Sequence, residues 1–246
     1  MNRFFLPKPD IAGSTLIIND KDKLHHIRRV LCLKPKERLV VFDGQGCEYD
    51  CIILSIGENV TLEIKDRRKQ KNFSSGAKLT IACAIPKKAK FDEIVDKLTQ
   101  LGASRIIPLI TERVVVRLDR GKEEARLLRW KKIAQSASEQ SKRSDIPVVE
   151  PVCKFKELLA RSKDFDLKLI PSLSGERRHI GEVLDKAAGK GSVLAVIGPE
   201  VDFSDGELRS AENCGFVPVS LGSLVLRVDT AAVAVASLFQ LTRDVS

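Results

Sequence analysis

Residues 192–238 read SVLAVIGPEVDFSDGELRSAENCGFVPVSLGSLVLRVDTAAVAVASL, and this stretch decides the fold. Residues 192–197 form an apolar run of β-strand length that ends at Gly198-Pro199, where a helix cannot follow directly. A second apolar run at 216–221 predicts another strand, which ends at Gly222. The pattern therefore indicates two strands, each followed by a loop that begins with glycine.

Each of these loops leads into a predicted helix. Ser204 and Glu207 have the spacing of a capping box, so a helix should begin there and end at Gly215. Asp229 or Thr230 can cap the last helix, whose sequence AAVAVASLFQL is apolar almost all round. Such a helix is normally buried on more than one side, either in a core or against a partner subunit.

The two loops, 198–203 and 222–229, leave the same ends of neighbouring strands. Ligands of open α/β sheets bind at this edge, and a leading glycine lets the backbone approach a ligand closely. Both loops also carry charged residues, namely Glu200, Asp202, Arg227 and Asp229. Because many turns between a strand and a helix contain glycine and polar residues, the pattern alone leaves both a ligand site and an ordinary turn open.

The alternation of strand and helix extends back to Lys78, which predicts an α/β fold with a mainly parallel sheet. Upstream strands are expected at 79–85, 106–110 and 165–170. The last of these strands ends at Pro171-Ser172, which begins a third loop at the ligand edge. Three loops from distant parts of the chain are therefore expected to meet.

The composition favours a polyanionic partner. The 246 residues include 42 Lys and Arg against 33 Asp and Glu, giving a net charge of +9 and a pI near 9.3. Neutralised phosphates supply most of the non-specific affinity for nucleic acids. An ordinary basic soluble protein would have the same balance, so charge alone does not decide. With 43% apolar residues, the chain can bury a sizeable core.

Neither a membrane segment nor a metal site is predicted. No apolar run reaches the roughly 18 residues that span a bilayer, and the stretch 7–10 interrupts the N-terminal apolar residues before a signal peptide could form. We therefore expect a cytoplasmic protein. The six cysteines are scattered without a C-x-x-C pair, and the three histidines complete no cluster of zinc ligands.

The motifs of 192–238 resemble those of the RsmE family of SPOUT-class RNA methyltransferases, which methylates N3 of a uridine in 16S ribosomal RNA. The family patterns are I-G-P-E-G-G-F-S and V-S-L-G-x-x-I-L-R-x-E-T-A. The matching residues are 197–200, 203–204, 219–222, 226–227 and 230–231. Two departures stand out: Val201-Asp202 replaces the Gly-Gly pair, and Asp229 replaces the glutamate of E-T-A.

This resemblance implies a SPOUT fold with a C-terminal trefoil knot and S-adenosylmethionine as the cofactor, without a metal ion. It also implies that the loops at the sheet edge hold the cofactor. The implied contacts are Ile170, Pro171, Ser172, Ile197, Gly198, Pro199, Glu200, Leu221, Gly222, Leu224 and Leu226. The apolar last helix predicts a homodimer, as in the family, although a core helix in a monomer would show the same pattern.

A separate β-rich unit is predicted for residues 1–72. Its strands are expected at 15–18, 38–42, 48–54 and 60–64, with a helix at 20–31 and a hairpin signal at 43–46. Arg3-Phe4-Phe5 and residues 26–31 resemble the opening motifs of the PUA-like RNA-binding barrel at the front of the same family. The basic stretch 66–76 marks the boundary, so we expect a PUA-like β-barrel at 1–72 and a SPOUT domain at 73–246.

Polar and basic residues outside the loops are candidates for contacts with 16S ribosomal RNA in the small ribosomal subunit, through phosphates and splayed bases. The segment EQSKR at 139–143 resembles the family's E-Q-S-x-R, which lies near the substrate RNA. The predicted RNA contacts are Arg3, His26, Arg28, Arg29, Lys87, Lys88, Arg113, Arg117, Gln140 and Arg143. Solvated surface residues would explain the same pattern.

The implied reaction sets requirements for catalytic residues. Methyl transfer from a sulfonium to a ring nitrogen is an in-line displacement, in which positioning supplies much of the acceleration. The N3–H of uracil must lose its proton, which calls for a base or for cationic groups that stabilise the anion. Arg227 is the first candidate for contacting the uracil or its phosphate. Asp229 and Glu200 are candidates for accepting the proton or orienting Arg227, and Asp229 as a plain helix cap stays open.

The motifs of two other nucleotide-binding fold classes are missing from the sequence. Two G-x-G triplets, at 44–46 and 189–191, precede no helix suited to a Rossmann-type turn, and no P-loop motif is present. Val201-Asp202 adds side chains where Gly-Gly would allow close backbone approach. A non-catalytic RNA-binding or ribosome-assembly protein of the same fold, or a SPOUT methyltransferase acting on another RNA, therefore stays open.

Overall fold

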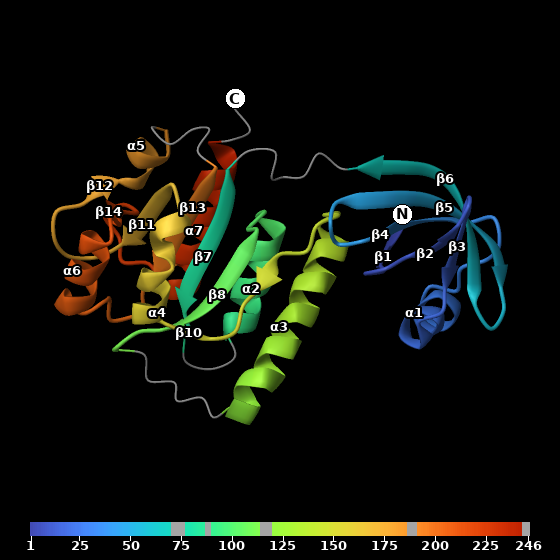
Figure 1. Ribbon diagram of the computed structural model, residues 1–246, viewed down its shortest axis with the longest axis horizontal. Helices are drawn as coiled ribbons and strands as arrows, with labels where there is room; N and C mark the ends of the chain where they lie inside the picture. Colours follow the sequence, from blue (N-terminus) through green and yellow to red (C-terminus); the bar gives the residue numbers. More distant parts are fainter. Residues whose placement is uncertain (70–76, 87–89, 114–119, 186–190, 243–246) are drawn as a thin grey trace. The chain divides into compact units, whose positions relative to one another are not determined.

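The computed structural model describes residues 1–69, 77–86, 90–113, 120–185 and 191–242, which form two compact units (Figure 1). The first unit comprises 1–72 together with 138–146, and the second comprises 73–137 and 147–246. Residues 138–146, which the sequence analysis assigns to the second domain, therefore belong to the first compact unit.

One six-stranded sheet, in the order β1-β4-β5-β6-β3-β2, occupies the described part of the first unit. Its strands are β1 (Asn2–Phe5), β2 (Asp10–Ala12), β3 (Thr15–Ile18), β4 (Arg38–Phe42), β5 (Cys47–Ile56) and β6 (Val60–Lys69). β1 pairs parallel with β4, whereas the other neighbours pair antiparallel. Because β6 continues to Lys69, residues 66–69 belong to the sheet and not to the predicted boundary segment.

The hairpin between β4 and β5 forms where its sequence predicts. The carboxylate of Asp43 accepts the backbone N–H groups of Gln45 at 2.7 Å and of Cys47 at 3.0 Å, which closes the turn. The predicted helix at 20–31 is also confirmed, as α1 (Lys21–His25) followed by a π-helical turn, η1 (His26–Val30). The side chain of Asp20 caps α1 by accepting the N–H of Lys23 at 3.0 Å.

Residues 138–146 complete the first unit through polar contacts. The hydroxyl of Ser144 donates to the carboxylate of Glu48, and the guanidinium of Arg3 donates to both side chains. Backbone hydrogen bonds add to this, from Gly46 N–H to the Ser144 carbonyl at 2.9 Å and from Ile146 N–H to the Gly44 carbonyl at 3.1 Å. The first unit is therefore discontinuous in sequence.

A parallel sheet forms the second unit, in the order β10-β8-β7-β13-β11-β14-β12, with β9 paired to β8. The strands are β7 (Lys78–Ala84), β8 (Arg105–Ile110), β9 (Val148–Val149), β10 (Cys153–Lys154), β11 (Leu167–Pro171), β12 (Arg178–His179), β13 (Ser192–Ile197) and β14 (Val217–Ser220). Every pairing among the described strands of this sheet is parallel. The predicted α/β fold with a mainly parallel sheet is confirmed.

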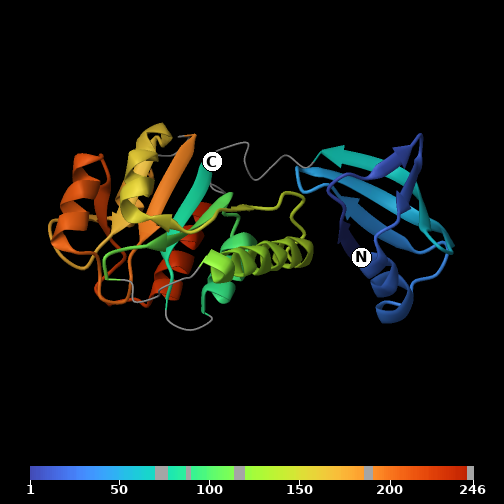
Figure 2. The same cartoon turned by 60° about the horizontal axis from the view of Figure 1, so that its bottom comes forward.

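Helices accompany this sheet, and α3 (Arg120–Gln140) continues into the first unit. The other helices are α2 (Lys90–Gln100), α4 (Phe155–Ala160), the 3-10 turn η2 (Ser162–Asp164), α5 (Ile180–Asp185), α6 (Asp205–Asn213) and α7 (Val228–Leu241). α4 and α6 lie on one face, over a core that includes Leu194 and Phe203, and α2 and α7 lie together on the other face (Figure 2). No helix in the described ranges is long and apolar enough to cross a membrane.

The two helices of the 192–238 stretch begin differently from each other. α6 has the predicted capping box, in which Ser204 Oγ accepts the Glu207 N–H at 3.2 Å and the Glu207 carboxylate accepts the Ser204 N–H at 3.0 Å. α7 begins earlier than predicted, because the Arg227 carbonyl already accepts the Ala231 N–H at 2.8 Å. The prediction that Asp229 caps this helix is wrong, since Asp229 lies inside its first turn. The trefoil knot stays a prediction.

Candidate functional site

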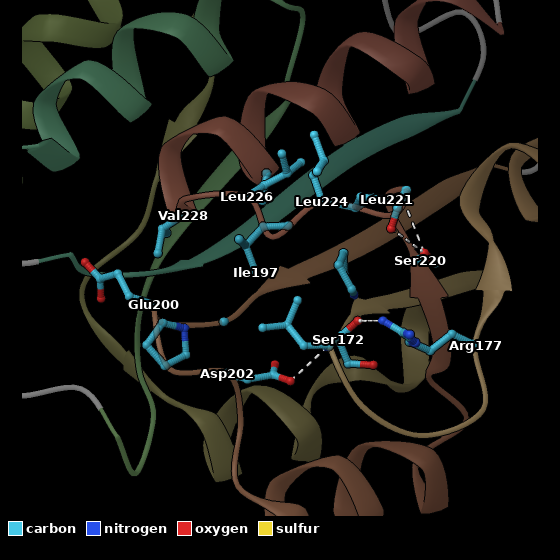
Figure 3. A pocket seen from close by; sticks show the side chains of 16 residues that line it. Ser172, Arg177, Ile197, Glu200, Asp202, Ser220, Leu221, Leu224, Leu226 and Val228 are labelled. Atoms are coloured by element: carbon cyan, nitrogen blue, oxygen red, sulfur yellow. Dashed lines mark hydrogen bonds between the residues drawn. The ribbon is translucent and has the colours of Figure 1, made fainter.

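A pocket lies at the ends of β11, β13 and β14 (Figure 3). Three segments surround it: the β11 loop (172–177), the β13 loop (198–203) and the β14 loop (221–227). The pocket is partly open to solvent, and its empty space is about 560 Å³ when the open mouth is included. Its lining residues are Pro171, Ser172, Leu173, Arg177, Ile197, Gly198, Pro199, Glu200, Asp202, Ser220, Leu221, Gly222, Leu224, Leu226, Val228 and Ala231.

Apolar and polar groups occupy different parts of the lining. Side chains from β13, the β14 loop and the start of α7 provide an apolar wall, namely Ile197, Leu221, Leu224, Leu226 and Val228. In the view of Figure 3, Glu200 lies at one end of the pocket and Arg177 at the other, with Asp202 below the apolar wall. An apolar wall with a few convergent polar groups suits a ligand that joins a flat ring to a charged or hydroxylated tail.

The β13 loop is held by hydrogen bonds along its length. Its backbone turns so that the Asp202 N–H donates to the Pro199 carbonyl at 3.0 Å. The guanidinium of Arg113 donates to the carbonyls of Val201 at 2.9 Å and Phe203 at 3.0 Å. Phe203 itself is buried. These hydrogen bonds hold the loop in a defined conformation.

Asp202 stands where the family has the second glycine of its Gly-Gly pair, and its backbone conformation is compatible with that of a glycine. Its φ is +64°, in the left-handed region that glycine adopts freely and that Asp and Asn adopt more readily than most other residues. Its carboxylate accepts the backbone N–H groups of Phe203 at 2.9 Å and of Leu173 at 2.8 Å. The loop therefore takes a glycine-like turn at this position, and the added side chain is hydrogen-bonded.

The β14 loop is more open. Gly222 has φ +119°, and no atom lies within 4 Å of the place where a Cβ would stand. Its N–H donates to Ser220 Oγ at 3.3 Å, which donates in turn to the Gly222 carbonyl at 3.1 Å. Leu224 and Val225 are 76% and 72% exposed. This loop presents its backbone and its apolar side chains to the pocket and to solvent.

The two predicted catalytic carboxylates both influence the same buried thiol electrostatically. Burial raises the pKa of Cys83 on β7, and the negative charges of Asp229 and Glu200 raise this pKa further. Both carboxylates therefore lie near the end of β7. Glu200 also lines the pocket, whereas Arg227 and Asp229 flank the lining residue Val228 on either side.

The predicted cofactor contacts and the pocket overlap closely. Of the predicted set, only Ile170 is absent from the lining, because its side chain is fully buried in β11. Sequence reasoning missed several residues that line the pocket: Leu173, Arg177, Asp202, Ser220, Val228 and Ala231. Asp202 stood next to a matched motif and could have been included. Arg177 has no local signal, because its place depends on the path of the β11 loop.

Several predicted RNA contacts are occupied within the protein. The side chain of Arg3 is 10% exposed and pairs with Glu48. The side chain of Arg143 is 2% exposed and pairs with Asp145 at 2.6 Å, which leaves no accessible guanidinium for RNA. Arg113 is exposed but binds the β13 loop. These three arginines therefore have structural partners.

The remaining RNA candidates divide by exposure. His26 and Arg29 are exposed on η1, and Gln140 is exposed at the end of α3. Arg28 is half-buried, and two of its guanidinium nitrogens are buried without a hydrogen-bond partner. The predicted contacts at Lys87, Lys88 and Arg117 lie outside the described residues. Within the described ranges, no group of three or more His, Cys, Asp or Glu side chains could hold a metal ion.

Comparison with known proteins places this geometry in a family. The model of an RNA methyltransferase domain matches residues 74–240, and that of an RNA methyltransferase PUA domain matches residues 18–65. Ribosomal RNA small subunit methyltransferase E of Bacillus subtilis is 30% identical over 94% of this chain and 93% of its own length.

Solved structures agree with these matches. Ribosomal RNA small subunit methyltransferase E from Neisseria gonorrhoeae, bound to S-adenosyl methionine, has a TM-score of 0.86 and 29% identity over 99% of this chain and 98% of its own. A methyltransferase from Legionella pneumophila in complex with the bound cofactor SAM has a TM-score of 0.86 and 29% identity over 98% and 97%. The chain therefore belongs to the ribosomal RNA small subunit methyltransferase E family of RNA methyltransferases.

Proposed function

We propose that this protein is an S-adenosylmethionine-dependent methyltransferase that modifies N3 of a uridine in 16S ribosomal RNA of the small ribosomal subunit. The observation that carries the proposal is the pocket formed by the three strand ends, in which backbone turns and an apolar wall converge. Relatives of nearly the same length are named for small-subunit ribosomal RNA methylation, and two structural neighbours are bound to S-adenosylmethionine.

The chemistry of the pocket lining fits this cofactor. Leu221, Leu224 and Leu226 offer apolar surface to an adenine ring, and the open backbone at Gly222 offers peptide groups to its edge. Glu200 provides a carboxylate for the ammonium or hydroxyl groups of the tail. When bound, the cofactor supplies an activated methyl group on a sulfonium.

The chain's own residues would then prepare the uracil. Arg227 is exposed at the N-cap of α7, directly before the lining residue Val228, where a guanidinium can stabilise a uracil anion or hold its phosphate. Glu200 lines the pocket, and Asp229 lies in the first turn of α7. We propose one of these two carboxylates as the acceptor of the N3 proton, directly or by orienting Arg227.

The non-catalytic alternative rested on the loss of the Gly-Gly pair. Since Asp202 adopts the left-handed turn and its carboxylate is hydrogen-bonded, the replacement leaves the pocket intact. We further propose that His26, Arg28, Arg29 and Gln140 contact the RNA, that the apolar helix α7 supports a homodimer, and that the protein acts in the cytoplasm.

Transfer of a labelled methyl group tests the proposal. Small subunits from a strain that lacks this modification should accept one label per 16S ribosomal RNA, and mass spectrometry of the digested RNA should find it on uridine N3. Arg227→Ala should lower kcat by about a hundredfold or more, as expected when a group that stabilises developing charge is removed. Cofactor binding without any transfer to RNA would favour an assembly factor. Label on another base would keep the enzyme class and change the substrate.

A further inference from the structure

The β11 and β13 loops are joined by one side chain. The carboxylate of Asp202 reaches from the β13 loop to the backbone N–H of Leu173 in the β11 loop, at 2.8 Å (Figure 3). The same carboxylate accepts the N–H of Phe203 at 2.9 Å, so that both of its oxygens are hydrogen-bonded to the backbone. Asp202 therefore ties two walls of the pocket together.

Both ends of this tie are anchored. On the β13 side, Arg113 binds the carbonyls of Val201 and Phe203, the residues on either side of Asp202. On the β11 side, the Ser172 N–H donates to the Val219 carbonyl of β14 at 3.2 Å, and Arg177 donates to the Ser172 carbonyl at 2.9 Å. A hydrogen bond between two anchored loops fixes their separation more effectively than one between two mobile loops, because less conformational freedom is lost in forming it.

We propose that Asp202 is a positioning residue, whose carboxylate holds the β11 loop against the β13 loop and so preorganises the wall of the cofactor pocket. The inference rests on the proposed function for its effect on cofactor binding, but the tie itself does not depend on that function. A Gly-Gly pair provides the same left-handed backbone without any side chain to reach Leu173. The aspartate therefore adds a fixed contact at a place where a glycine would leave the loops untied.

A different role would be direct attraction between the Asp202 charge and the sulfonium of the donor. The two roles differ in their dependence on the ligand. A tie between loops affects the methyl donor and its demethylated product, S-adenosylhomocysteine, by the same factor. Direct charge attraction acts mainly on the donor, because the product has lost the sulfonium charge.

Two substitutions separate these roles. Asp202→Gly keeps the left-handed turn and removes the tie, and it should weaken the binding of both ligands by about tenfold to a hundredfold, as expected for loss of a hydrogen bond to a charged group. Asp202→Asn also tolerates the left-handed turn. Its single amide oxygen can accept the Leu173 N–H while the hydrogen bond from the Phe203 N–H is lost, so the variant should retain more affinity than Asp202→Gly. Val201→Ala is the matched control, since this neighbouring side chain is 60% exposed and does not line the pocket.

The measurements are calorimetric titration with both ligands, steady-state kinetics, and hydrogen exchange at the Leu173 amide. For Asp202→Gly we expect a raised KM for the donor with unchanged kcat at saturation, and faster exchange at Leu173 in the free protein. Exchange at Leu173 that is equally slow in the glycine variant would overturn the tie. A loss confined to the donor, and as large for Asp202→Asn as for Asp202→Gly, would overturn it in favour of direct charge attraction.

Results that refute the proposed function can be told apart from results that refute the positioning role of Asp202. If the unmodified protein binds neither ligand, the methyltransferase proposal fails, while faster exchange at Leu173 in Asp202→Gly would still establish the tie between the loops. If the protein binds both ligands and the glycine variant binds them equally well, the positioning role fails and the methyltransferase proposal stands.

Discussion

The β13 and β14 loops both begin with a glycine and both line the pocket, yet the two glycines are needed for different reasons. At Gly198 a Cβ would lie 2.8 Å from the ring of Phe203, so the residue is glycine because the site is crowded. At Gly222 no atom lies within 4 Å of a Cβ, and the residue is glycine because its φ is +119°.

The loops also differ in how they are held. The side chain of Arg113, which lies outside the β13 loop, binds the backbone of that loop. The exposed side chains of Leu224 and Val225 leave the β14 loop largely to solvent. We infer that the β13 loop is a fixed wall of the pocket and that the β14 loop is the wall that adjusts to a ligand. Substitutions in the two loops should therefore differ in their effects on stability and on cofactor affinity.

The largest effect is expected from Gly198→Val. The new side chain must displace the buried ring of Phe203, and overpacking of this kind costs about 2–3 kcal/mol of stability. Chemical denaturation should show this loss, and cofactor binding should be lost with it. Gly206→Ala is the control, because its Cβ would meet only Ser204 Oγ at 3.8 Å. An unchanged denaturation midpoint for Gly198→Val would show that the β13 loop is not a fixed wall.

A smaller effect on stability is expected from Gly222→Ala. Nothing obstructs the methyl group, so the cost is the strain of a left-handed backbone, about 1 kcal/mol. Affinity for the cofactor should fall more than stability, because the strained loop moves away from its binding conformation. Gly57→Ala, whose Cβ also meets nothing within 4 Å and whose φ is not left-handed, should leave both quantities unchanged. A stability loss equal to that of Gly198→Val would remove the difference between the loops.

Arg113→Ala should have a still smaller effect on stability. The guanidinium is exposed, so its two hydrogen bonds to loop carbonyls contribute about 0.5–1 kcal/mol. The variant should unfold at a slightly lower denaturant concentration and show faster amide exchange in the β13 loop. Arg113→Lys should restore only part of the effect, because an ammonium lacks the planar fork that reaches both carbonyls. Arg209→Ala, on the exposed surface of α6, serves as the control.

The smallest effect is expected outside both loops, at the Asp20 cap of α1, which serves as a reference for the two loops. The pKa of Asp20 is lowered, first by the backbone hydrogen bond from Lys23 and then by its side chain. A lowered folded-state pKa means that this cap stabilises α1 above the ordinary pKa near 3.8 and loses its effect as the pH falls through the folded-state value. Amide exchange in α1 should therefore accelerate slightly in acid, and Asp20→Asn should remove that dependence. If amide exchange in the β13 loop accelerated in acid by the same amount as in α1, the acceleration in α1 could not be assigned to the Asp20 cap.

Much of the fold could be predicted from local sequence signals. The apolar run at 192–197 is β13 to the residue, and the capping box at Ser204 and Glu207 forms as its spacing predicts. Alternating apolar runs and helices were enough to indicate a parallel sheet, and the glycines at 198 and 222 marked the loops that meet at its edge. These features depend on neighbours in sequence, which is why pattern alone could find them.

The features that escaped prediction depend on partners far along the chain. Asp202 looked like an obstacle in a glycine loop until its partner, the Leu173 N–H, was known. Arg143 looked like an RNA contact because it lies in a motif that resembles E-Q-S-x-R and is charged. Neither the motif nor the charge tells which way a side chain faces, and Arg143 is buried against Asp145. Ile170 was placed in the pocket because strand ends were known only to within a residue or so.

The discontinuity of the first unit has a consequence for the order in which the protein is made. During translation the strands up to Lys69 are synthesised long before Ser144. At that stage Glu48 can pair with Arg3, but the Ser144 hydroxyl that hydrogen-bonds to both side chains does not yet exist. The backbone partners of Gly44 and Gly46 arrive equally late. The contacts from residues 138–146 to the first unit can therefore form only after more than half of the polypeptide has been translated, although domains commonly fold as units from the N-terminus. A fragment cut at the apparent boundary would remain in that unfinished nascent state.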